Sequence, residues 1–147
     1  WEGELEIWTV DSVLQKVRMQ LIIEGEEDVS WNIVYGEDGL DNRKYFLRAI
    51  NAQAGHYIID EMDGIELDCY VKGNKLISGF DVQGSFLSIQ EELTAEGIVY
   101  EVVVYDANNI KYTSQTPPDS LTAVKPEDLI KCYPNVSYQK ALLKKKK

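Results

Sequence analysis

Residues His56–Val71, which read HYIIDEMDGIELDCYV, show the pattern that recurs along this chain. Two short runs rich in β-branched and aromatic residues are joined by an Asp-Gly turn at Asp63-Gly64, which is typical of a β-hairpin. In the second run, Glu66 and Asp68 share one face and the residues between them share the other. Similar runs recur on both sides at regular spacing. We therefore expect this hairpin to be one unit of a larger antiparallel sheet.

The same alternation continues along most of the chain. It is clearest between Gln15 and Ile23, where Val17, Met19 and Leu21 alternate with charged or polar residues. The predicted strands are 5–9, 15–23, 31–35, 43–50, 56–60, 65–71, 76–83, 87–93, 98–105 and 136–143. Both faces of 43–50 carry aromatic residues, so its inward face is undecided.

The turns between these runs are short, so consecutive strands should pair antiparallel as a meander. A meander this long either closes or leaves exposed edges that favour aggregation. The sequence therefore predicts one all-β domain, residues 1–147, folded as a single antiparallel up-and-down β-barrel of about 8–10 strands. The last strand is expected to close the barrel against the first.

The strand pattern breaks between Tyr112 and Pro134, where the prolines exclude a central strand and favour a long ordered loop. Within it, Lys125–Lys131 has a proline followed by two acidic residues, which predicts one short helix.

The formal charge of the chain is −10. Nucleic-acid binding requires a basic face, so this balance argues against a nucleic-acid partner. The acidic residues are concentrated in the first half of the chain. They could attract a cationic partner or a divalent ion, or simply form a solvated surface. No apolar stretch approaches the length of a membrane-spanning helix, so no transmembrane segment is expected.

The two cysteines, Cys69 and Cys132, allow either one disulfide bridge or two small buried side chains. Neither belongs to a metal-binding spacing, and we expect no metal site and no cofactor.

His56 is the only histidine, so any hydrolytic dyad or triad would depend on it. Asp60 lies on the same face of the strand but about 13 Å away, too far for a hydrogen bond. A carboxylate cluster around Asp63 could bind Ca²⁺ or serve glycoside chemistry, but a solvated hairpin explains it without a ligand. We therefore assign no catalytic residue.

The aromatic residues suggest a binding site more directly. Three Trp, three Phe and nine Tyr on a β-meander could line a cavity, since ligand pockets combine apolar walls with a few polar groups. They could equally fill a core. The residues predicted to line the cavity wall are Trp31, Tyr45, Phe80 and Tyr100.

The segments WEGEL at 1–5, Trp8 and the basic last strand YQKALLK at 138–144 resemble the calycin β-barrels, the lipocalins and their relatives. In that family a tryptophan of the first strand is covered by a basic side chain from near the last strand. The lipocalin order Gly-x-Trp is not present, because Trp1 precedes Gly3. The segments at 55–61, 64–68 and 138–143 are also similar to a group of uncharacterised bacterial proteins. That similarity implies export to the periplasm, the cell envelope or the exterior. It does not indicate an activity.

Three functions are consistent with the sequence. The first is a non-enzymatic barrel that binds a small apolar or amphipathic ligand. The second is a structural or protein-interaction module of the cell envelope that uses the acidic half or the proline-rich loop. The third is a hydrolase or isomerase in which carboxylates from other strands join His56. The sequence leaves the oligomeric state open.

Overall fold

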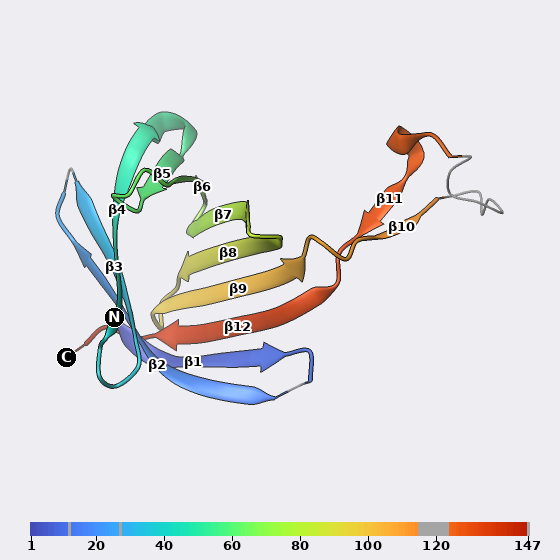
Figure 1. Ribbon diagram of the computed structural model, residues 1–147. Coiled ribbons are helices and arrows are strands. Elements are labelled where there is room, and N and C mark those ends of the chain that lie inside the picture. The colour runs from blue at the N-terminus through green and yellow to red at the C-terminus, as the bar shows by residue number, and fades with distance from the viewer. Residues whose placement is uncertain (12, 27, 115–123, 147) are drawn as a thin grey trace.

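The computed structural model describes residues 1–11, 13–26, 28–114 and 124–146. Ten antiparallel strands form a closed barrel, in which each strand pairs with its neighbour in sequence and the last pairs with the first (Figure 1). This confirms the predicted all-β meander. The barrel strands are β1 (Glu2–Thr9), β2 (Leu14–Glu24), β3 (Val29–Tyr35), β4 (Asp41–Asn51), β5 (His56–Asp60), β6 (Glu66–Lys72), β7 (Lys75–Val82), β8 (Ser85–Leu93), β9 (Ile98–Asp106) and β12 (Asn135–Leu143).

Closure of the barrel joins the two ends of the chain. Strand β12 lies between β9 and β1, with Ala141 opposite both Tyr100 and Leu5. On the outside of this seam, the rings of Trp8 and Tyr138 stack with their centroids 5.5 Å apart. The predicted pairing of the last strand with the first is therefore confirmed.

Strands β5 and β6 form the predicted hairpin of residues 56–71. Its loop is longer than a two-residue turn, because pairing stops at Asp60 and resumes at Glu66. The Asp63 carboxylate accepts a hydrogen bond from the backbone N–H of Ile65, and Gly64 has a φ of +98°, which favours glycine. A one-turn 3-10 helix, Ala52–Ala54 (η1), connects β4 to β5.

The late segment differs from the expected loop. Strands β10 (Lys111–Thr113) and β11 (Ile130–Cys132) form a separate two-stranded sheet, which extends away from the barrel in Figure 1. The prolines lie outside these short strands, so they remove no hydrogen bond from the ladder. The predicted short helix is a single 3-10 turn, Pro126–Asp128 (η3), and Pro117-Pro118 lies outside the described residues.

One end of the barrel is packed. It is the end where β1 begins and β12 ends, and the side chains of Met19, Leu21 and Leu143 are completely buried there. They belong to one apolar core cluster that also contains Leu5, Trp31, Ile98 and Tyr100. We call this the packed end.

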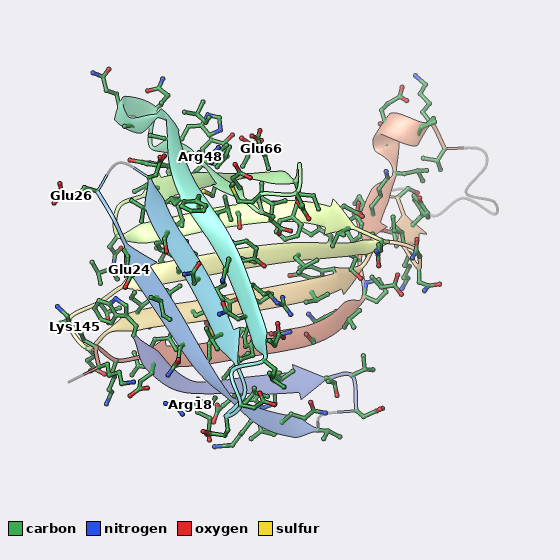
Figure 2. The ribbon with its side chains drawn as sticks, turned by 60° about the vertical axis from the view of Figure 1, so that its left-hand side comes forward. Arg18, Glu24, Glu26, Arg48, Glu66 and Lys145 are labelled. Carbon is green, nitrogen blue, oxygen red and sulfur yellow. The ribbon has the colours of Figure 1, made fainter. Side chains whose placement is uncertain are left out.

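The outside of the barrel carries much of the charge. Figure 2 shows Arg18, Arg48 and Glu66 on the outer surface, as the alternation of β2, β4 and β6 requires. Arg18 pairs with Glu2 and Glu37, each at 3.0 Å. In the described part of the chain, no helix is long and apolar enough to cross a membrane.

The two cysteines are not bridged. Cys69 is completely buried on β6, whereas Cys132 is exposed on β11. The disulfide alternative is therefore wrong, and the alternative of two buried side chains is correct for Cys69 and wrong for Cys132.

Candidate functional site

The barrel encloses a cavity of about 880 Å³. This volume lies within the range of about 300–1,000 Å³ that is typical of small-molecule sites. Aliphatic and aromatic side chains from the inner face make most of the wall. The exposed lining residues Asp41, Arg43, Ile65, Asp81 and Val82 all lie at the end opposite the packed end, so the cavity opens there. We call this opening the mouth.

The four aromatic residues predicted from the sequence all line the cavity. Trp31 on β3 lies directly opposite Tyr45 on β4, which settles the inward face of β4. Phe80 on β7 and Tyr100 on β9 complete the set. That these side chains contact a ligand stays a prediction.

Glu91 was missed by the sequence reasoning and lies deepest among the charged lining residues. It follows Leu87 and Ile89 on the inner face of β8 and stands opposite Leu76 on β7 and Tyr100 on β9. Its side chain is only 7% exposed. The sequence does indicate this position, because Glu91 is the one acidic residue in an alternating series that otherwise contains the apolar residues Leu87, Ile89 and Leu93.

The Glu91 carboxyl lacks a strong partner. Within the described residues, no ion pair and no hydrogen bond of ordinary geometry reaches it. Burial raises the pKa of Glu91 to about 7, and the nearby indole N–H of Trp31 offsets this only partly. Trp31 Nε1 is itself buried without a hydrogen-bond partner in the described structure. A buried indole N–H without a hydrogen bond of ordinary geometry and a buried carboxyl without a cationic partner therefore lie close together at the bottom of the cavity.

Two tyrosines continue this polar region. The hydroxyl groups of Tyr35 and Tyr100 are 3.4 Å apart. Burial raises the pKa of both phenols, so both are neutral at physiological pH. Each hydroxyl keeps capacity for a further hydrogen bond.

Arg43 is the one cationic side chain in the lining of the described cavity. It lies near the mouth, half exposed, with its guanidinium 5.0 Å from the centre of the Tyr35 ring. Its Nε and an Nη donate to the two oxygens of Asp41 at 3.2 and 3.3 Å. These hydrogen bonds raise the pKa of Arg43. The charge of Arg43 is thus already compensated by Asp41, on the same strand.

The carboxylates around the Asp63 turn do not form one site. Asp60 pairs with Arg48 at 2.7 Å on the outer face, Asp63 caps the turn, and Glu61 lines the cavity. Burial raises the pKa of Glu61, and the neighbouring Asp63 adds to this effect. In the described ranges, no three Asp, Glu, His or Cys side chains are grouped to hold a metal ion.

His56 lies on the outside of the barrel. Its Nε2 is 2.5 Å from Oδ1 of Asp68 on the adjacent strand β6, and its ring stacks on Tyr70 at 4.8 Å. Asp60, on its own strand, is occupied by Arg48. A carboxylate from another strand does reach His56, but this pair is separate from the cavity lining.

A scan of the chain against protein-family models found no match. Searches of curated proteins and of solved structures also found none. The proposals below therefore depend on the geometry of this chain.

Proposed function

We propose that this protein is a non-enzymatic barrel that binds a small amphipathic molecule in its interior. The cavity of about 880 Å³ is the observation that carries the proposal. Interiors of globular proteins are normally close-packed, with few voids larger than a water molecule. A barrel that only needed stability could have filled this space with larger side chains.

The energetics of an empty cavity support this interpretation. Unfilled volume in a core costs about 24 cal/mol per Å³, so a void of this size would cost about 20 kcal/mol. Domains are stable by only about 5–15 kcal/mol. Water or a ligand must therefore occupy the space, and walls such as Ile33, Leu87 and Ile89 favour an apolar body over water.

The polar groups of the cavity favour an amphipathic ligand over a purely apolar one. Trp31 Nε1 is buried without a hydrogen-bond partner in the described structure, the Glu91 carboxyl lies beside it without a cationic partner, and Tyr35 and Tyr100 are also lining residues. Ligand sites use a few such groups to orient a molecule within apolar walls.

We infer in addition a relationship to the calycin barrels. The supporting observations are the closed ten-strand meander, the pairing of β1 with β12, and the tryptophan of the first strand, Trp8, packed against Tyr138 of the last.

The binding proposal is tested by native mass spectrometry of protein purified gently from its own host, together with titration of an environment-sensitive apolar dye. We expect a bound small molecule or saturable dye binding at one site per chain. The variant Ile89→Trp places a large ring in the middle of the cavity and should weaken dye binding. Gln90→Trp adds the same ring to the outer face of β8 and should bind as the parent does. A bare mass together with no dye binding would contradict the proposal.

A further inference from the structure

The charge of the cavity lining is strongly unbalanced. Three acidic residues at inward positions, Asp41, Glu61 and Glu91, stand against one guanidinium, from Arg43, while Asp81 alternates to the outer face at the rim. Arg43 is bound through two hydrogen bonds to Asp41. The cavity as a whole therefore favours a cation over an anion.

Glu91 makes the bottom of the cavity the most favourable position for the positive charge of a ligand. A buried carboxylate normally has a cationic partner or several hydrogen-bond donors, because an isolated buried charge is costly. The described residues supply neither. An ammonium group placed beside Glu91 would provide both a positive charge and N–H donors.

The walls around Glu91 suit the same chemistry. Trp31, Tyr35 and Tyr100 surround this region, and the electron-rich faces of aromatic rings attract cations. The Tyr35 and Tyr100 hydroxyls can also accept N–H donors. Leu76 lies opposite Glu91, and toward the mouth the wall of β8 is aliphatic, with Ile89 and Leu87.

We propose that the ligand is an apolar amine, whose ammonium group pairs with Glu91 at the bottom of the cavity while its hydrocarbon part lies along the aliphatic wall toward the mouth. This rests on the proposed ligand-binding function and adds the chemical class of the ligand. A fatty carboxylate is disfavoured, because it would face Glu91 in the interior or displace Asp41 from Arg43 at the mouth.

The pH dependence of binding follows from the groups around Glu91. The pKa of Glu91 is about 7, and that of an alkylamine is near 10, so both partners are charged between these values. The groups that interact with Glu91 from β3, β6 and β9 are Tyr35, Cys69 and Tyr100, and burial raises the pKa of each. They stay neutral between pH 5.5 and 8. Burial also raises the pKa of Glu61 at the mouth, so the variant Glu61→Gln is needed as a separate control.

The test compares three probes with the same chain length: 1-aminododecane, 1-dodecanol and dodecanoate, each below its aggregation concentration. Displacement of the bound dye at pH 7.5 gives the affinity of each. We expect the amine to bind at least about tenfold more tightly than the alcohol, since a hydrogen bond to a charged group contributes that much or more. Dodecanoate should bind most weakly, and amine affinity should increase between pH 5.5 and 8.

Three Glu→Gln variants locate the recognition group. Glu91→Gln should reduce amine affinity about tenfold and leave alcohol affinity within about twofold. Glu92→Gln makes the same change at the next residue, on the outer face of β8, and should leave both affinities unchanged. Glu61→Gln, at the mouth, should have a smaller effect than Glu91→Gln. An equal or larger effect of Glu61→Gln would overturn the placement of the ammonium group.

The remaining outcomes distinguish failure of the amine proposal from failure of the proposed ligand-binding function. If neither the dye nor any probe binds and the native mass is bare, the ligand-binding proposal fails and the inference fails with it. If the dye binds but the amine does not displace it, only the inference fails. If the alcohol or dodecanoate binds as tightly as the amine, or if Glu91→Gln keeps the preference for the amine, the barrel is a ligand-binding protein with a different ligand. Circular dichroism of each variant confirms that it is folded.

Discussion

Replacement of Glu91 by glutamine should stabilise the ligand-free protein, and the gain should depend on pH. Burial raises the pKa of this carboxyl from 4.5 to about 7. The folded state therefore holds the proton more tightly than the unfolded chain does. Ionisation of Glu91 opposes folding above pH 4.5, and the full penalty is present above pH 7. Below pH 4.5 the group is protonated in both states and contributes nothing.

The size of the effect follows from this difference. Each unit of pKa corresponds to about 1.4 kcal/mol, so the penalty at high pH is about 3 kcal/mol. Glutamine has nearly the shape of the protonated side chain and no charge. The stability advantage of Glu91→Gln should grow from below about 1 kcal/mol at pH 5 to about 3 kcal/mol at pH 8.

Urea unfolding followed by tryptophan fluorescence at pH 5 and pH 8 measures this advantage. Comparison of the two proteins at each pH cancels the titration of all other groups. Glu92→Gln is the matched control, because hydrogen bonds from Asn74 and Lys75 lower the pKa of Glu92 and its charge therefore favours folding above the unfolded pKa. It should give no gain at pH 8. If the advantage of Glu91→Gln is the same at both pH values, the carboxylate is as well solvated as in the unfolded chain and the reasoning is refuted.

Two further predictions concern glycine substitutions in turns and the reactivity of the two cysteines. Gly97→Ala should lower the free energy of unfolding by at least about 2 kcal/mol in urea, because the added Cβ would collide with a carbonyl oxygen of β12. Gly73→Ala meets nothing within 4 Å and should cost only about 1 kcal/mol, from its positive φ. A thiol reagent should modify Cys132 rapidly in the native protein and Cys69 only on unfolding, because burial raises the pKa of Cys69 to about 12. Rapid labelling of two thiols in the native state would contradict this burial.

The barrel strands were predictable because their alternation reports burial directly. Strand β2 is the clearest case, since every inward residue from Val17 to Ile23 is apolar. Strand β4 was predicted, but its inward face was not, because Tyr45 and Phe46 are both aromatic and only the pairing with β3 shows that Tyr45 faces inward. The late sheet was missed since its strands have three residues each, too few for a pattern.

The site was predictable in its walls and not in its polar centre. Trp31 and Tyr100 could be proposed as wall residues because large aromatic residues on inner faces line whatever space exists. Glu91 shares the alternation of Leu87 and Ile89, but it was not selected, because an acidic side chain near the end of a strand is usually exposed. Similarly, the contact between His56 and Asp68 depends on the register of two strands, which the sequence does not specify.

Glu91 links the stability of the barrel to its proposed ligand. In the ligand-free protein its charge costs about 3 kcal/mol above pH 7, although the indole N–H of Trp31 offsets part of the effect of burial. Natural proteins break local rules of this kind mainly at functional sites. An amine bound beside Glu91 would remove the penalty and add the usual stabilisation of the bound state. A saturating amine should therefore stabilise the parent more at pH 8 than at pH 5.5, and should lose this pH dependence in Glu91→Gln. A group that is only a packing defect would give the same ligand-induced stabilisation at both pH values.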